Sequence, residues 1–70
     1  METNEEQVTR NIQSSRKRRG YSQEDIALKL NWTTRTIINL ESKPFSYSIK
    51  KLNEYADAIG CNINEFFLPL

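Results

Sequence analysis

Residues 22–41 read SQEDIALKLNWTTRTIINLE and hold two short helical patterns joined by a tight corner. Apolar side chains recur at helical spacing in both halves of the stretch: Ile26, Ala27, Leu30, Ile37 and Leu40. Residues 31–33, between the two patterns, leave room only for a sharp turn. The small side chain of Ala27 falls where two crossing helices approach most closely. The stretch therefore predicts two helices packed across a short turn, a helix-turn-helix.

Capping residues mark the ends of both predicted helices. Ser22 and Asp25 have the spacing of a capping box, in which each side chain accepts a hydrogen bond from the other residue's backbone N–H. Asn31 ends the first helix, because asparagine tolerates the left-handed conformation better than most residues. Thr33 caps the second helix, which we expect over residues 34–40.

The rest of the chain predicts three further helices around this pair. The first covers residues 5–19 and ends at Gly20, which takes the left-handed conformation at little cost. The second covers residues 49–59, and the last is a short apolar helix over residues 63–67. The apolar stripe of the second consists of Ile49, Leu52, Tyr55, Ala56 and Ile59. We therefore expect an all-α fold, a compact five-helix unit that takes residues 1–70 as a single domain.

Composition argues against several other classes of protein. The chain has 70 residues, one cysteine and no histidine. Cys61 alone cannot close an internal disulfide, and the lack of histidine weakens any metal site or histidine base. There is no apolar run long enough to span a membrane, and the N-terminus is not a signal peptide. We expect a cytoplasmic protein, not an enzyme, with no cofactor, metal, membrane or small-molecule ligand.

The net charge of +1 conceals an uneven distribution. Residues 8–51 hold all ten lysines and arginines against three acidic residues, whereas residues 1–7 and residues 52–70 hold three acidic residues each. A basic middle between acidic ends is expected where one face of a protein meets a polyanion. A chance grouping of solvated charges is the alternative. The basic segment coincides with the two central helices, which favours a nucleic-acid partner.

These features together resemble the Cro/phage-repressor, or lambda-repressor-like, helix-turn-helix family of DNA-binding domains over residues 8–68. The resemblance rests on the order and spacing of Arg16, Gly20, Tyr21, Ser22, Gln23, Ile26, Ala27, Leu30, Thr33, Ile37, Leu40, Glu41, Leu52, Ala56, Ile59, Gly60, Ile63, Phe66 and Phe67. The chain departs from the family at Asn31 and Trp32 in the turn, and at Lys43 and Tyr47. The resemblance implies a sequence-specific DNA-binding transcriptional regulator whose second central helix enters the major groove of double-stranded DNA.

The predicted reading helix carries side chains suited to base recognition. We expect base contacts from Thr34, Arg35, Ile38 and Asn39. The Arg35 guanidinium can bond guanine O6 and N7 together, Asn39 can pair with adenine, and Ile38 can touch a thymine methyl. Each has a plainer interpretation: a phosphate contact for Arg35, a solvated amide for Asn39 and an ordinary exposed isoleucine for Ile38.

Phosphate contacts are expected around the reading helix, from Arg16, Gln23, Thr33, Thr36 and Lys43. The family resemblance implies that Gln23 opens its helix against a phosphate and that Arg16 pairs with Glu41. The first assignment has a physical basis, because a helix N-terminus offers free amides and partial positive charge to an anion. The alternative for Gln23 is an ordinary exposed residue in the first turn.

The apolar end of the chain, within residues 61–70, predicts a homodimer, because a small domain cannot bury all of it. We expect the interface to consist of Phe45, Ile49, Phe66, Phe67, Leu68 and Leu70, with one of the two adjacent phenylalanines turned into the core. A two-fold dimer places two reading helices one DNA turn apart, about 34–36 Å, on a palindromic operator.

The sequence thus predicts a repressor that binds its operator as a homodimer. A phage Cro-like repressor, a restriction–modification controller and an antitoxin-like autoregulator all fit this description. The alternative function is a protein-interaction module that uses the same fold without DNA. Such a module need not place Arg35 and Lys43 beside the basic end of the first helix.

Overall fold

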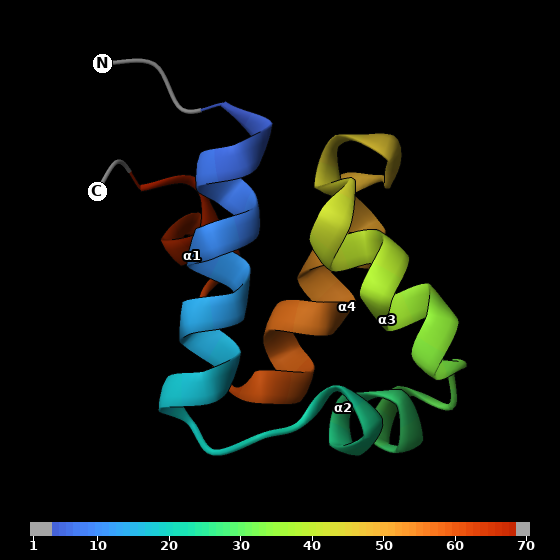
Figure 1. Ribbon diagram of the computed structural model, residues 1–70. Helices are drawn as coiled ribbons and strands as arrows, with labels where there is room; N and C mark the ends of the chain where they lie inside the picture. The colour runs from blue at the N-terminus through green and yellow to red at the C-terminus, as the bar shows by residue number, and fades with distance from the viewer. Residues whose placement is uncertain (1–3, 69–70) are drawn as a thin grey trace.

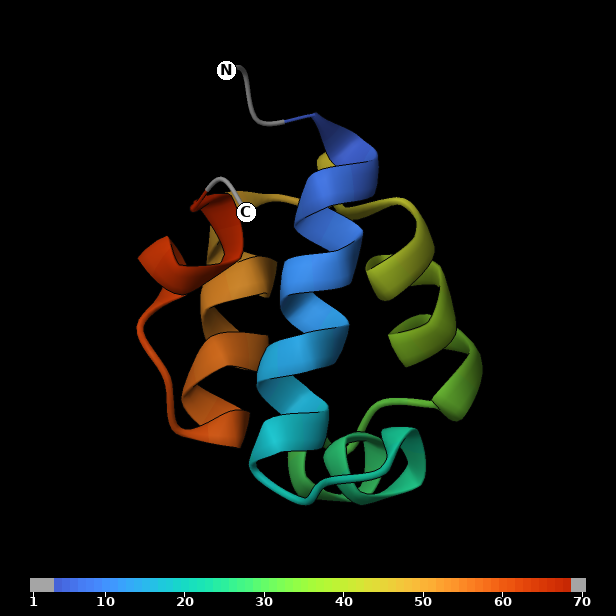
Figure 2. The ribbon, with the colours of Figure 1, turned by 60° about the vertical axis from the view of Figure 1, so that its left-hand side comes forward.

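The computed structural model describes residues 4–68 (Figures 1 and 2). The elements in chain order are α1 (Glu5–Arg18), α2 (Gln23–Leu30), α3 (Thr34–Ser42), the 3₁₀ helix η1 (Pro44–Ser46), α4 (Ile49–Ile59) and the 3₁₀ helix η2 (Ile63–Phe67). The described part of the chain contains no strand, which confirms the all-α class. None of its helices has both the length and the apolar character that a membrane crossing requires.

The prediction of five α-helices was wrong by one. Residues 4–68 contain four α-helices, and the predicted last helix is the 3₁₀ helix η2. A segment of five residues is too short to gain much from α-helical bonding, and such short pieces often adopt the tighter 3₁₀ pattern. A second 3₁₀ turn, η1, lies where the sequence suggested only a loop.

The starts of α2 and α3 and the end of α2 lie where the capping residues predict, whereas α3 continues to Ser42, beyond the predicted end at residue 40. The Ser22 hydroxyl accepts the backbone N–H of Asp25 at 3.0 Å, and the Asp25 carboxylate accepts the N–H of Ser22 at 2.8 Å. Thr33 caps α3 by accepting the N–H of Thr36 at 3.1 Å. Asn31 has a φ of 59° and takes the left-handed conformation at the end of α2. An asparagine therefore forms this corner, at a position where the chain departs from the family that it resembles.

The helices pack around one apolar core. In Figure 1, α2 crosses below the other helices, and α3 rises from it beside α4. Figure 2 shows α1 upright, with α3 on one side and η2 on the other. The buried apolar side chains are Val8, Ile12, Ile26, Ala27, Ile37, Leu40, Leu52, Tyr55, Ala56, Ala58, Ile59 and Phe66. Because α1 and α4 both contribute, the angle between α2 and α3 is fixed by the whole domain.

The C-terminal segment is attached to α1 by a side-chain amide. Asn11 Nδ2 donates to the carbonyl oxygen of Phe66 at 2.9 Å and to that of Leu68 at 2.6 Å. The Phe66 ring is fully buried and meets Tyr55 edge-on, with the ring centroids 5.9 Å apart. This corrects the expectation that Phe66 belongs to a dimer interface. Of the two adjacent phenylalanines, Phe66 is the one that turns into the core.

Candidate nucleic-acid interface

Helix α3 presents opposite faces to the core and to solvent. Its inward side chains are buried: Ile37, Leu40 and Glu41. Its outward side chains are exposed: Arg35, Ile38 and Asn39. Three of the four predicted base readers therefore share one free face. Ile38 is 39% exposed, so a partner surface that covered it would gain the free energy of removing aliphatic area from water.

Threonine hydroxyls organise the first turn of α3. The hydroxyls of Thr33 and Thr36 lie 3.0 Å apart and share a hydrogen bond, in addition to the backbone cap. Both were predicted to contact phosphate, and the structure places them together at the start of α3. Thr34, the fourth predicted base reader, is half-buried and lines a neighbouring cleft.

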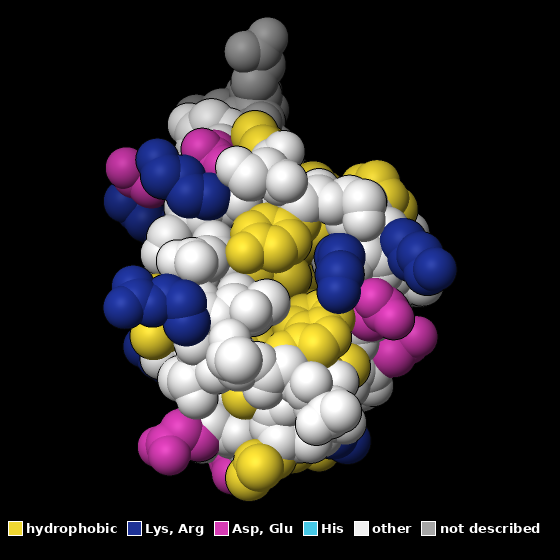
Figure 3. Space-filling model, turned by 90° about the vertical axis from the view of Figure 1, so that its right-hand side faces the viewer, with side chains coloured by type: hydrophobic (Ala, Val, Ile, Leu, Met, Phe, Trp, Pro, Cys, Tyr) yellow, Lys and Arg dark blue, Asp and Glu magenta, His cyan; other side chains and the backbone are white. Residues whose placement is uncertain are grey.

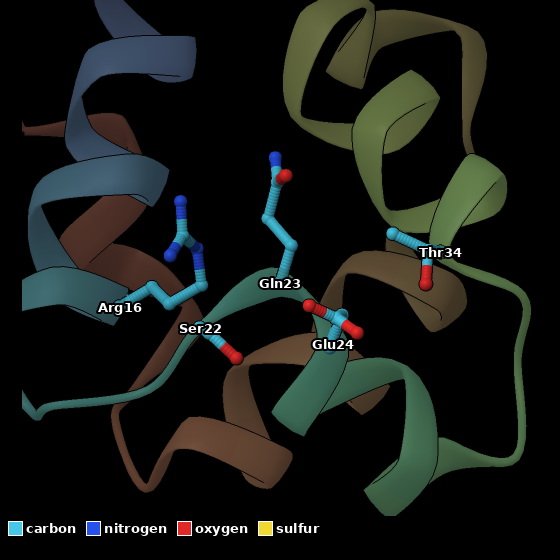
Figure 4. A pocket seen from close by; sticks show the side chains of 5 residues that line it. All are labelled: Arg16, Ser22, Gln23, Glu24 and Thr34. Carbon is cyan, nitrogen blue, oxygen red and sulfur yellow. The ribbon is translucent and has the colours of Figure 1, made fainter.

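This cleft has a volume of about 470 Å³ and opens between the end of α1 and the starts of α2 and α3 (Figure 4). It is lined by Arg16, Ser22, Gln23, Glu24 and Thr34. Figure 4 shows the Gln23 side chain rising from α2 into the space between α1 and α3. The first backbone amides of a helix have no partner within it and carry partial positive charge. Although Glu24 adds one negative charge to the lining, the start of α2 offers donors to an anion.

A buried carboxylate behind the cleft joins all four α-helices. Glu41 Oε2 accepts hydrogen bonds from Arg16 Nε at 2.8 Å and from the Tyr55 hydroxyl. Its Oε1 accepts one from Gln23 Nε2 at 3.0 Å. These donors offset the cost of burying a charge, which is several kcal/mol for an unpaired ion. The four residues hold α1, α2, α3 and α4 at one point.

The charges in this network are mutually dependent. Burial, followed by the hydrogen bond and charge of Glu41, raises the pKa of the Tyr55 hydroxyl. Tyr55 therefore remains a protonated donor. For Arg16, burial opposes the charged form, but the hydrogen bond and charge of Glu41 outweigh it and raise the pKa of the guanidinium. The sequence placed Tyr55 only in the apolar stripe of α4, and its hydroxyl was the sole signal of this second role.

Arg16 is an interior residue rather than a surface cation. It is 6% exposed, and its Nη1 donates to the carbonyl oxygen of Tyr21 at 2.9 Å while Nε is bound to Glu41. Most of its guanidinium is enclosed and already bonded, although the side chain borders the cleft, so the phosphate contact of Arg16 stays a prediction. The pair with Glu41 that the family resemblance implied is present.

Acidic partners neutralise much of the basic run at the end of α1. Glu65 Oε2 lies 2.6 Å from Arg18 Nη2 and 3.1 Å from Arg19 Nη1. The hydrogen bonds from the Ser15 hydroxyl and from Arg19 lower the pKa of Glu65. The sequence did not predict this cluster, because Glu65 lies 47 residues beyond Arg18 and 46 beyond Arg19.

Arg35 and Lys43 differ from that run, because both are exposed and form no ion pair within residues 4–68. Arg35 lies on the outward face of α3, and Lys43 directly follows that helix. Their charge is therefore available to an anionic partner, on the side of the domain that the sequence predicted.

Trp32 closes the corner between α2 and α3 and packs against the core. Its backbone N–H donates to the carbonyl oxygen of Ala27 at 2.9 Å. On its other side, Lys51 Nζ lies 4.6 Å from the ring centroid, within reach of a cation–π interaction. Figure 3 shows the face at the right of Figure 1, where apolar side chains gather between basic ones.

The remaining predicted interface residues divide into three groups. Phe45, Ile49 and Leu68 are each more than half exposed. Phe67 is half-buried and packs against the core. Leu70 lies outside the described residues. Three large apolar side chains are therefore accessible to a second molecule.

Two helices across a short turn, the second exposed along its outer face and supported by α1 and α4, define a helix-turn-helix domain. A family model described as Helix-turn-helix matches residues 12–66, and the chain belongs to this family. The resemblance to Cro- and lambda-repressor-type domains is thereby confirmed, and the chain is a DNA-binding transcription regulator of a family that is not typically enzymatic. Comparisons with curated proteins and with solved structures gave no match.

Proposed function

We propose that the protein is a repressor that reads a specific operator sequence with the outward face of α3. The observation that carries this proposal is the combination of Arg35, Ile38 and Asn39 on one exposed face. A guanidinium, an aliphatic group and an amide match guanine, thymine methyl and adenine edges in the major groove. Thr34, at the rim of the cleft, is positioned for a base or an adjacent backbone oxygen.

The backbone of the DNA is contacted on both sides of α3. On one side, the start of α2 and the Gln23 amide offer donors at the cleft, and Thr33 and Thr36 add hydroxyls at the start of α3. On the other side, at the end of α3, Lys43 offers a cation that forms no ion pair within residues 4–68. Contacts of this kind fix the register of a protein on the duplex, whereas contacts with base edges specify the sequence.

The repressor acts as a homodimer on a palindromic operator. The exposed side chains of Phe45, Ile49 and Leu68 support this proposal, because large apolar groups at such exposure gain free energy when a second copy covers them. Two-fold pairing places the α3 helices about 34–36 Å apart, in successive major grooves. Repression is favoured over activation, because occupying a promoter requires no further partner. A phage Cro-like repressor, a restriction–modification controller and an antitoxin-like autoregulator all fit this proposal.

The test is the salt dependence of DNA affinity, measured on a duplex recovered by selection from a random library. With two phosphates neutralised, Kd should rise at least about tenfold between roughly 50 and 200 mM salt. In a homodimer, Lys43→Gln removes one phosphate contact from each protomer and should flatten that slope by about two units. A Kd that does not respond to salt would contradict the proposed phosphate contacts. A failure to select any duplex would favour the alternative, a protein-interaction module.

A further inference from the structure

We propose that Tyr55, inside the domain, is a positioning residue for phosphate binding: its hydroxyl fixes the Glu41 carboxylate, and Glu41 in turn orients the side-chain amide of Gln23 at the cleft. This inference rests on the proposed function, since it assigns a role within the same DNA-binding site. It extends the site from the surface of α2 and α3 to the interior face of α4.

Each oxygen of the Glu41 carboxylate accepts two hydrogen bonds. Oε2 accepts from the Tyr55 hydroxyl and from Arg16 Nε at 2.8 Å. Oε1 accepts from Gln23 Nε2 at 3.0 Å and from Arg16 Nη2 at a longer 3.4 Å. Without the Tyr55 hydroxyl, Oε2 keeps one donor, and Arg16 can draw the carboxylate away from Gln23. Tyr55 and Gln23 thus hold opposite oxygens of one carboxylate.

The orientation of Gln23 matters because its side chain borders the cleft. A primary amide has two N–H donors that point in different directions and one carbonyl acceptor. The bond to Glu41 uses one N–H of the Gln23 amide and thereby fixes the direction of the other N–H. That second N–H and the backbone amides at the start of α2 are the donors at the cleft. A preoriented donor loses less conformational entropy when it binds a phosphate than a freely rotating glutamine does.

Burial makes the Tyr55 hydroxyl hard to replace. Tyr55 is 0% exposed and Glu41 is 1% exposed, so bulk water does not reach this end of the carboxylate. The Tyr55 ring has a separate role, because it packs edge-on against Phe66. A phenylalanine would preserve this packing and remove only the hydroxyl, which separates the structural role of the ring from the positioning role of the oxygen.

The test compares Tyr55→Phe with Tyr21→Phe, a matched control whose hydroxyl meets only Lys29 at 3.4 Å on the exposed surface. Kd is measured on the selected duplex and on an unrelated duplex of equal length. Because the Gln23 side chain would then have to be ordered on binding, Tyr55→Phe should weaken binding of both duplexes about fivefold to tenfold, and Tyr21→Phe should leave it unchanged. The loss should be equal for the two duplexes, because phosphates carry no sequence information.

A double-mutant cycle separates positioning from general destabilisation. In a Gln23→Ala background, Tyr55→Phe should cause no further loss of affinity, because the amide that it orients is already gone. The same fivefold loss in that background, or no loss in the single variant, would overturn the inference. A wild-type protein that bound neither duplex would instead overturn the proposed function.

A measurement on the wild-type protein keeps the inference testable if Tyr55→Phe does not fold. The side-chain ¹⁵N order parameter of Gln23 should match those of the backbone amides in α2. The side chain of Gln13, half-buried on α1 and outside the network, provides the comparison. A Gln23 amide as mobile as that of Gln13 would overturn the inference.

Discussion

Arg16 Nε lies 2.8 Å from Glu41 Oε2 in the interior of the domain, and this pair ties the end of α1 to the end of α3. Arg16→Ala should leave Glu41 as a buried charge short of donors and cost about 3–5 kcal/mol of unfolding free energy. Arg10→Ala, which breaks the exposed pair with Glu6, should cost only about 0.3–0.5 kcal/mol. Urea denaturation followed by circular dichroism measures both. Equal losses in the two variants would contradict the structural role of the buried pair.

The left-handed Asn31 should make the corner between α2 and α3 sensitive to a single side chain. With φ at 59°, Asn31→Ala should cost about 1 kcal/mol, whereas Asn31→Gly should change stability by only a few tenths of a kcal/mol. In a domain of this size, 1 kcal/mol corresponds to a fall in Tm of about 4–8 °C. Thermal unfolding of the two variants provides the measurement. An alanine variant as stable as the glycine variant would refute the left-handed conformation of Asn31.

The ionised Glu65 carboxylate should stabilise the domain, and this contribution should be lost at acid pH. Its pKa is lowered in the folded state from 4.5, so its contribution is present above that pH and is lost as the pH falls through the folded pKa. Glu65→Gln should therefore lower stability at pH 7, by no more than about 1 kcal/mol because the carboxylate is partly solvated. Its unfolding free energy should also decline less steeply than that of the wild type between about pH 5 and pH 3. Glu54→Gln, on the exposed side of α4, is the control. If the stability of Glu65→Gln declined as steeply as that of the wild type, the result would argue against the Glu65 cluster.

The proposed dimer should depend on the exposed apolar side chains at one end of the domain. Phe45→Ser combined with Ile49→Ser should shift the protein toward monomer in sedimentation velocity, with little loss of stability, because both side chains are already solvent-exposed in the single chain. Leu28→Ser on α2 is a matched control, since Leu28 is more exposed than either and lies outside the proposed interface. If the double variant sediments as the wild type does, the interface lies elsewhere.

The sequence predicted the fold where local chemistry decides it. The capping box at Ser22, the left-handed Asn31 and the Thr33 cap depend on neighbours within a few residues, and each formed as expected. The outward position of Arg35 followed equally from helical periodicity.

What the sequence could not predict depends on contacts between distant residues. The family resemblance implied the pair of Arg16 with Glu41, but the neutralisation of Arg18 needs Glu65, which lies 47 residues further along the chain. Tyr55 counted as one member of an apolar stripe, because a hydropathy pattern does not reveal what its hydroxyl will meet. Long-range partners of this kind appear only when the helices are packed.

The most direct test of the central claim, that α3 reads base sequence, is the specificity of Arg35→Ala beside that of Lys43→Ala. Kd is measured for each variant on the selected operator and on duplexes that carry each single-base change. Arg35→Ala should weaken operator binding by about 1–3 kcal/mol and abolish discrimination at one base pair. Lys43→Ala should weaken all duplexes equally and preserve the pattern of discrimination. A uniform loss in both variants would show that Arg35 contacts only phosphate, and would contradict base reading at this position of α3.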